Sequence, residues 1–294
     1  MINFRSLWFQ VNITRGGRLT MADDREILRE IWEGKVPVCF QLAQEEVYTG
    51  EQPDPFFLLV PRLSYFPLVT DKVLRHMMKH VDPEHHGEMW LEFDGQPLKW
   101  HYPIGVLFDL YGMSTDLPWK LTVHFQNFPE EELLRCSSKE VVQSHFISVV
   151  KEADALKHRG QVINSMQKKD HSTLWAGFMN DKFDQFWSVN KRLMENSGEK
   201  AFMFVPFRIY RADQIPVQKL FKPCADSGES LTLRHLLKTA VPELMETDAL
   251  ISSRVLIQGI EPPLDTPVCW LSEHLSYPDN FLHICLMPRV EVES

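Results

Sequence analysis

Apolar residues follow two different spacings along the chain. In the first and last thirds they form short alternating or continuous runs, which are typical of strands. In the middle third they recur every three to four residues, which indicates amphipathic helices. Strands of the first third are predicted at 36–42, 56–60, 89–93 and 119–125, and helices at 70–81 and 103–110.

The last third repeats this order. Its strands are predicted at 204–210, 217–221, 254–258 and 281–286, and its helices at 231–241 and 267–275. The runs beginning at Pro103 and Pro267 match in detail, since each has a proline, an aliphatic residue, a helical turn, a second proline and a closing strand. A duplication explains the match better than chance. The order of elements is that of a ubiquitin-like β-grasp, so the predicted fold class is α+β, with two such domains flanking a helix-rich domain and preceded by an N-terminal helix.

The helix that opens the middle segment has one apolar side. At about 100° per residue, that side collects Phe146, Val149, Val150, Ala153, Leu156, Gly160 and Ile163. Lys151 falls opposite their centre, so its ammonium is expected to be solvated and reachable from outside. Lys157 falls beside the apolar side and is expected to be partly covered. Spacing alone does not separate Lys151 from other lysines on solvated helix faces, which are normally charged.

Other helices are predicted on both sides of this one. Apolar residues from Leu174 to Met194 cover nearly half the surface of a single helix, which indicates burial against more than one neighbour. Ser137–Glu140 fits a capping box at the start of the helix that carries Lys151. Near the N-terminus, Asp23 or Asp24 is expected to cap a helix that Gly34 ends. The buried side of that helix is predicted to be Ile27, Leu28, Ile31 and Trp32.

These patterns divide the chain into segments. We expect an extension of unknown role, an N-terminal helix, a first ubiquitin-like domain, a helix-rich domain, a second ubiquitin-like domain and a short tail. Their expected bounds are, in that order, 1–20, 21–35, 36–127, 128–197, 198–290 and 291–294.

Composition narrows the class of protein. Hydrophobic residues make up 44% of the 294 residues and charged residues 24%, which is enough apolar surface for packed cores. The net charge of -9 makes nucleic acid an unexpected partner, because nucleic acid attracts basic surfaces. The five cysteines are an odd number without C-x-x-C spacing, which indicates free thiols in a reducing compartment. No apolar run approaches the ~18 residues that a membrane-spanning helix needs, so a cytoplasmic location is expected.

The sequence carries none of four common catalytic and ligand-binding motifs. The chain lacks H-E-x-x-H, G-x-x-x-x-G-K-[ST], G-x-G-x-x-G and G-x-S-x-G, so no cofactor is predicted. His85 and His86 lie together in a polar loop without nearby ligands, which favours an ordinary surface. Cys136 has no local base, which favours an idle thiol over a nucleophile. A basic cluster, predicted to be able to touch anionic lipid, consists of Lys157, His158, Arg159, Lys168 and Lys169.

Several strings closely resemble the autophagy-related protein 5 family. They are KEADALKH at 151–158, MQKKDH at 166–171, DKFDQFW at 181–187, WLSEHLSYPDNFLH at 270–283, LVTDKV at 68–73 and LKWHYPIG at 98–105. The resemblance runs from about Met21 to about Pro288, and the extension before Met21 lies outside it.

The resemblance implies a function without a catalytic site in this chain. It implies that the lysine of the K-E-A-D string, here Lys151, is joined by an isopeptide bond to the carboxy-terminal glycine of autophagy-related protein 12, a ubiquitin-like modifier. It also implies binding of the amino-terminal helix of a coiled-coil protein, autophagy-related protein 16. The resulting complex would act like an E3 ligase with the E2-like carrier of the autophagy-related protein 8 family, promoting lipidation at the phagophore membrane, where the chain would make peripheral contact.

Alternatives remain open at the level of sequence. If Lys151 is not the acceptor, Lys157 and Lys139 are the next lysines to consider. A second hypothesis is a membrane or protein-binding adaptor that acts without conjugation, through the basic cluster. A third is a cysteine or metal enzyme using Cys136. Trp32, Trp175 and Trp187 are among the aromatic residues that fit packed domains with a groove for a partner helix.

Overall fold

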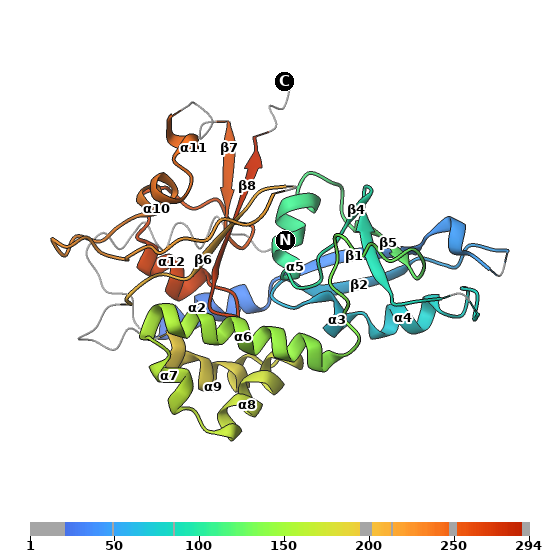
Figure 1. The fold of residues 1–294 in the computed structure, drawn as a ribbon, viewed down its shortest axis with the longest axis horizontal. Coiled ribbons are helices and arrows are strands. Elements are labelled where there is room, and N and C mark those ends of the chain that lie inside the picture. Colours follow the sequence, from blue (N-terminus) through green and yellow to red (C-terminus); the bar gives the residue numbers. More distant parts are fainter. Residues whose placement is uncertain are drawn as a thin grey trace. The chain divides into compact units, whose positions relative to one another are not determined.

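The computed structural model describes residues 21–48, 50–84, 86–194, 202–212, 214–246 and 252–289. The chain forms two compact units, one of Lys35–Ile147 and one of Met1–Gly34 together with Ser148–Ser294. Each unit contains one sheet and its own helices (Figure 1). The resulting fold is α+β, as the residue patterns predict.

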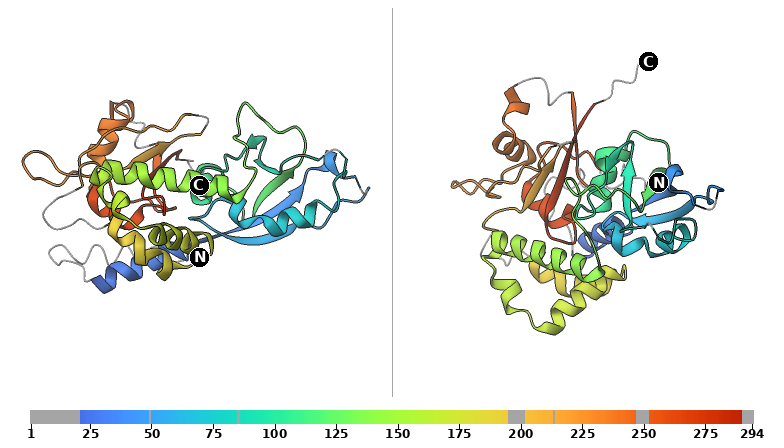
Figure 2. Two further views of the ribbon diagram at one scale, coloured as in Figure 1. Left: turned by 60° about the horizontal axis from the view of Figure 1, so that its bottom comes forward. Right: turned by 45° about the vertical axis from the view of Figure 1, so that its right-hand side comes forward.

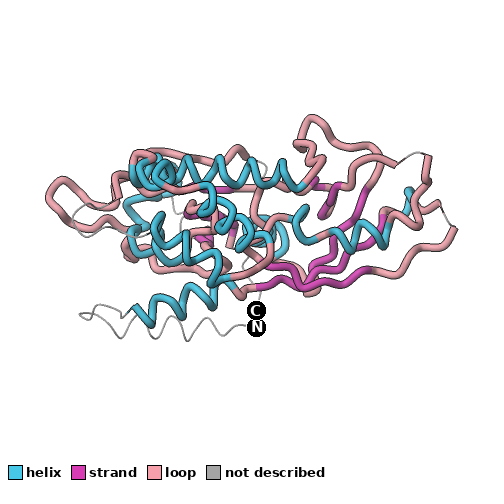
Figure 3. Tube along the Cα trace, turned by 90° about the horizontal axis from the view of Figure 1, so that it is seen from below, coloured by secondary structure: helices cyan, strands magenta, loops and turns pink. Residues whose placement is uncertain are grey.

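The unit Lys35–Ile147 is built on a five-stranded sheet in the order β2-β1-β5-β3-β4. Strand β1 is antiparallel to β2 and parallel to β5, and β3 is antiparallel to β5. Figure 3 shows its strands in magenta. The strands are β1 (Lys35–Leu42), β2 (Phe56–Pro61), β3 (Trp90–Phe93), β4 (Gln96–Pro97) and β5 (Trp119–His124), and the helices are α3 (Phe66–Val69), α4 (Asp71–Met77) and α5 (Ile104–Leu107), the last continued by a π-helical turn.

Alternation along β1 explains which face of this sheet is buried. Val36, Val38 and Phe40 point to the same face and are almost completely buried in the core of the unit. Trp119 on β5 joins the same core, packed against the rings of Phe66, Phe93 and Phe108. The predicted strands at 36–42, 56–60, 89–93 and 119–125 are therefore confirmed to within a residue or two.

The second sheet repeats the pairing of the first. Strand β6 (Phe207–Tyr210) is parallel to β8 (Leu282–Pro288), and β7 (Ser253–Leu256) is antiparallel to β8. These three strands relate to one another as β1, β5 and β3 do, which confirms the predicted repeat. Helices α10 (Leu233–Ala240) and α12 (Val268–Leu275) lie beside this sheet, with α11 (Glu243–Glu246) following α10 (Figure 2).

The prediction of a strand at 217–221 is wrong. This segment contributes a single bridge, between Val217 and Ile209. Pro216 has no backbone N–H to donate to a ladder, and the side chains of Gln218, Lys219 and Leu220 are all exposed, so burial does not enforce alternation.

The remaining helices are grouped around the C-terminal part of α6 (Figure 1). They are α2 (Met21–Trp32), α6 (Lys139–His158), α7 (Gln161–Ser165), α8 (Lys168–Met179) and α9 (Phe183–Met194). Because α2 already includes Met21, neither Asp23 nor Asp24 is its cap. Helix α6 begins at Lys139, so Ser138 and not Ser137 takes the N-cap position, and the third residue of the helix is Val141, which cannot complete the predicted capping box.

The single helix predicted from Leu174 to Met194 is in fact a hairpin of α8 and α9. The chain reverses at Asp181, whose φ of 53° lies in the left-handed region. The apolar periodicity continues through this turn because both helices bury one face against the other. Gly177 allows the close approach, since a Cβ there would lie 2.5 Å from the backbone nitrogen of Phe186.

Candidate functional site

Lys151 lies on the solvent side of α6. Its neighbours Val149 and Ala153 are buried and pack against Phe281, which precedes β8, with Leu156 at the edge of the cluster. The Lys151 side chain is exposed, as the helical periodicity predicts. Among the residues that the structure describes, it makes no hydrogen bond or ion pair. An amine in this position is open to a large reaction partner.

The residue that follows Lys151 is held in place. Glu152 accepts a hydrogen bond and ion pair from Arg208 Nη2 (2.9 Å) and a second hydrogen bond from Gln218 Nε2 (2.6 Å). Arg208 Nε also donates to Gln218 Oε1 (3.1 Å), so the three side chains close a ring. We call Glu152, Arg208 and Gln218 the α6 clamp, since it ties α6 to β6.

The guanidinium of Arg208 is charged and stacked on one aromatic ring. It lies 4.2 Å from the centre of the Phe281 ring, on which it stacks. Burial alone would lower the pKa of Arg208, but the neighbouring Tyr210, Asp279 and Glu152 outweigh burial and raise it. The positive charge of the α6 clamp is therefore permanent.

Lys157, on the same helix, is buried much more deeply than predicted. The residue is only 2% exposed. Its Nζ lies 3.2 Å from the sulfur of Met194 and 4.7 Å from the centre of the Phe202 ring. Burial lowers the pKa of this amine to about 8, against the opposing pull of acidic neighbours, first among them Glu273. An enzyme-bound acyl group has no access to it in this fold.

Lys139, the other alternative acceptor, is engaged at the first turn of α6. Its ammonium forms an ion pair with Asp71 (Nζ–Oδ2 2.5 Å). This ion pair would have to be broken before the amine could reach an acyl group.

The predicted basic cluster is smaller than expected. Lys157 is buried and His158 is half-buried, with its Nε2 3.2 Å from the carbonyl oxygen of Leu193. Arg159, Lys168 and Lys169 are exposed. The exposed basic surface is therefore carried by these three residues.

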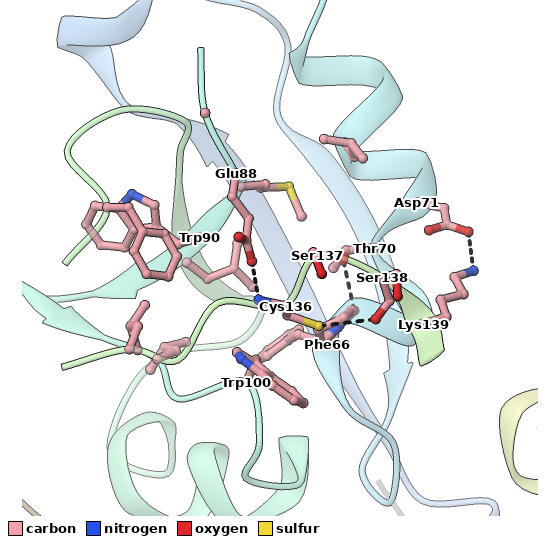
Figure 4. A pocket seen from close by; sticks show the side chains of 18 of the residues that line it. Phe66, Thr70, Asp71, Glu88, Trp90, Trp100, Cys136, Ser137, Ser138 and Lys139 are labelled. Carbon is pink, nitrogen blue, oxygen red and sulfur yellow. Dashed lines mark hydrogen bonds and ion pairs between the residues drawn. The ribbon is translucent and has the colours of Figure 1, made fainter. Parts of the chain in front are cut away.

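Cys136 lies on the rim of a cavity of about 540 Å³ in the unit Lys35–Ile147 (Figure 4). Its backbone N–H donates to Glu88 and its thiol lies 3.7 Å from the carbonyl oxygen of Ser138. Burial, reinforced by the charge of Glu88, raises the pKa of the thiol to about 11, so it is protonated at neutral pH. This disfavours a nucleophilic role. The walls of the cavity are mainly apolar and include Phe66, Leu74, Met89, Trp90, Leu98 and Trp100.

Of the two neighbouring histidines, His86 is exposed, and His85 lies outside the described residues. No group of three or more His, Cys, Asp or Glu side chains in the described part of the chain is arranged to hold a metal ion.

The tryptophans named from the sequence contribute to packing. Trp32 of α2 lies against Phe186 (ring centres 5.0 Å apart) and Phe183 (5.8 Å) of α9. Trp187 stacks on Phe183, and Trp175 is buried on α8. Aromatic contacts thus hold the N-terminal helix to the helical hairpin.

A buried polar chain in the second sheet was not predicted. His283 Nε2 lies 2.9 Å from Asp279 Oδ2, and its Nδ1 lies 2.7 Å from the hydroxyl of Tyr210. Burial pushes the pKa of Asp279 upwards, but His283 and Arg208 outweigh it and hold the pKa below its usual range. Tyr210 is 73 residues from His283, so no local pattern could have joined them.

None of the helices in the described part of the chain combines the length and the apolar character that crossing a bilayer requires.

Three family models match the chain. The model of Autophagy protein ATG5, UblA domain, matches residues 31–125, that of the alpha-helical bundle region matches 139–196, and that of the UblB domain matches 204–286. The matched regions follow the order of sheet, helices and second sheet seen in the structure.

Relatives and a solved structure agree with these models. The chain is 48% identical over 268 residues to Autophagy protein 5 of Drosophila melanogaster, covering 90% of this chain and 97% of the relative. It is 32% identical over 273 residues to Autophagy-related protein 5 of Caenorhabditis elegans, covering 90% and 98%. The fold is similar to the crystal structure of Kluyveromyces marxianus Atg5, with a TM-score of 0.74 at 20% identity over 89% of this chain and 99% of that one.

Proposed function

Since this chain belongs to the autophagy protein 5 family, we propose that Lys151 accepts the carboxy-terminal glycine of the ubiquitin-like autophagy-related protein 12. The role in autophagy comes with the family, and the acceptor is our proposal. The observation that carries it is the exposed position of Lys151 on α6, without an ion pair among the described residues. An amine in a conjugation reaction must reach an acyl group held by another protein, and Lys151 meets that need.

The competing lysines are poorer acceptors for physical reasons. Burial lowers the pKa of the Lys157 amine to about 8, but Met194 and Phe202 enclose this amine. Lys139 is reachable but paired with Asp71. We therefore rank the three lysines by their accessibility.

The proposed reaction is an acyl transfer from a thioester. The lone pair of Lys151 Nζ attacks the carbonyl carbon of the modifier's terminal glycine, the C–N bond forms, the C–S bond to the carrier cysteine breaks, and the carrier leaves as a thiolate. The ammonium must first lose one proton, and the attacking nitrogen loses a second proton as the amide forms; both pass to water or to bases of the ligating enzymes. No step in this scheme requires a catalytic group of this chain.

We further propose that the conjugate acts as a scaffold in the cytoplasm. With the coiled-coil autophagy-related protein 16, it would form an E3-like complex that promotes lipidation of autophagy-related protein 8 family members at the phagophore membrane. Two sheets with ubiquitin-like pairing, and a helical region between them in the sequence, support such a role because they offer several binding surfaces in one chain. The domain bounds that we propose are 36–127, 128–197 and 198–290.

The test uses Lys151→Arg in the full chain, expressed in cells that lack their own copy. Arginine keeps the positive charge but cannot form the isopeptide bond, so the adduct should disappear from a denaturing gel. Lys168→Arg is the matched control, because Lys168 is also an exposed lysine in the helical region. It should leave the adduct at its normal level. An adduct undiminished in Lys151→Arg, with its branched peptide mapped to another lysine, would overturn the proposal.

A further inference from the structure

The α6 clamp points to a role beyond stability. We infer that Arg208 is a positioning residue for the conjugation reaction, which holds the turn of α6 that presents Lys151 to the modifier. This inference rests on the proposed function of Lys151. Arg208 would act through Glu152, the residue next to the acceptor, and would not touch the reacting atoms.

Beyond Lys151, the next turn of α6 is fixed by a hydrogen bond from the Ile163 N–H to Asp154 Oδ2 (3.0 Å) and by the buried Lys157. Beside Lys151 itself, the small side chains of Val149 and Ala153 meet the single ring of Phe281. Hydrophobic contact is non-directional, so this contact does not by itself orient the turn that carries Lys151. A charged hydrogen-bonded pair depends on direction as well as distance.

The α6 clamp supplies that directional contact. Arg208 is anchored at the sheet, with its side chain only 21% exposed and its guanidinium stacked on Phe281, whereas the side chain of Glu152 is 43% exposed. The fixed partner is thus on β6 and the held partner on α6. At 100° per residue, Val149 and Ala153 lie on one side of Glu152 and Lys151 on the other, so holding Glu152 holds Lys151 towards solvent.

The α6 clamp also keeps a carboxylate occupied. Both oxygens of Glu152 accept hydrogen bonds, one from Arg208 and one from Gln218. With both oxygens engaged, the carboxylate that follows the acceptor in sequence is held on the β6 side of the helix.

The experiment measures transfer of autophagy-related protein 12 from its thioester-loaded carrier to the purified full-length chain. Arg208→Gln should lower kcat about tenfold, the loss expected from misplacing a nucleophile by a fraction of an ångström, and should change KM for the loaded carrier by less than about twofold. Arg211→Gln is the matched control, since it breaks another ion pair that begins next to β6, with Glu243 (2.7 Å). The control should transfer at the wild-type rate.

A double-mutant cycle separates positioning through Glu152 from other effects of Arg208. Glu152→Ala should lower kcat as much as Arg208→Gln does, and the double variant should lower it no further, because Arg208 acts through Glu152. Equal melting temperatures of wild type and Arg208→Gln would exclude unfolding as the cause of the slower transfer. A kcat within about twofold of wild type in Arg208→Gln, or losses that multiply in the double variant, would overturn the role of Arg208 while Lys151→Arg still abolishes transfer. Undiminished transfer to Lys151→Arg would instead overturn the proposed acceptor, and the inference with it.

Discussion

Nζ of Lys157 lies 3.2 Å from the sulfur of Met194, although Lys151, six residues earlier on the same helix, is exposed. The two lysines differ because α6 is covered on one side only. Met194 ends α9 and Phe202 follows it in the chain, and both close over the Lys157 side chain. One helix therefore carries an amine that other proteins can reach and an amine that is buried.

The buried amine predicts a pH-dependent stability. The pKa of Lys157 is about 8 in the folded chain and about 10.5 when unfolded, so between these values the unfolded state binds more protons. Stability due to this group is therefore lowest below pH 8 and rises as the pH increases towards 10.5. Compared with Lys157→Met, the wild-type chain should gain about 3 kcal/mol of unfolding free energy across this range, as an upper estimate.

The measurement is urea unfolding of both proteins at several pH values between 7 and 10.5. Below pH 8, Lys157→Met should be the more stable protein, because methionine fills a similar volume without burying a charge. Lys151→Met serves as the control for losing a lysine from α6. Wild-type and Lys157→Met stabilities that stay parallel through the whole range would contradict the buried ammonium.

The exposure of Lys151 could be predicted from sequence, but the burial of Lys157 could not. The first depends only on local apolar spacing, with Val149 and Ala153 opposite Lys151. The second depends on Met194 and Phe202, which are distant in the chain and carry no signal of their contact with α6. Arg208 and Glu152 are likewise 56 residues apart, so the α6 clamp appears only in the structure.

The fold divides in the same way. The repeated order of strands was visible because each strand has its own apolar run and its own turns. The division of α8 from α9 could not be predicted, because the helix ends near Asp181 while the apolar spacing continues through the turn. The prediction of a strand at 217–221 was wrong because the side chains at 218–220 remain exposed, so the apolar residues of this segment do not indicate a buried face.

The hairpin predicts an unusual effect of Gly177→Ala. Alanine favours a helix over glycine by about 1 kcal/mol, so the change would ordinarily stabilise α8. Here the new Cβ would lie 2.5 Å from the backbone nitrogen of Phe186, and backbone cannot move aside cheaply. We expect the unfolding free energy to fall by about 2 kcal/mol, measured by urea unfolding. The exposed Ser172→Ala on the same helix should change it by less than about 0.5 kcal/mol.

The attachment of α2 predicts that aromatic packing outweighs ion pairs. Trp32 is buried against Phe183 and Phe186, so Trp32→Ala should lower the unfolding free energy by about 3 kcal/mol. Trp32→Phe keeps most of this packing and should cost much less. Asp184 pairs with Arg25 and Arg29 at the exposed surface, where salt screens charges, so Asp184→Asn should change stability little. A larger loss from Asp184→Asn than from Trp32→Ala would reverse this ranking.

The exposed basic residues allow a test of the adaptor alternative. The chain carries a net charge of -9, and the buried Lys157 removes one cation from the predicted cluster, so unconjugated protein should bind anionic vesicles weakly at physiological salt. Each lysine near such a surface contributes about 1 kcal/mol, so Lys168→Glu with Lys169→Glu would weaken any binding through this cluster more than tenfold. Lys72→Glu with Lys79→Glu is the control, because it makes the same change in net charge with exposed lysines elsewhere. Sedimentation with phosphatidylserine vesicles measures all three proteins. Strong binding that only the first pair abolishes would favour an adaptor that acts through lipid before conjugation.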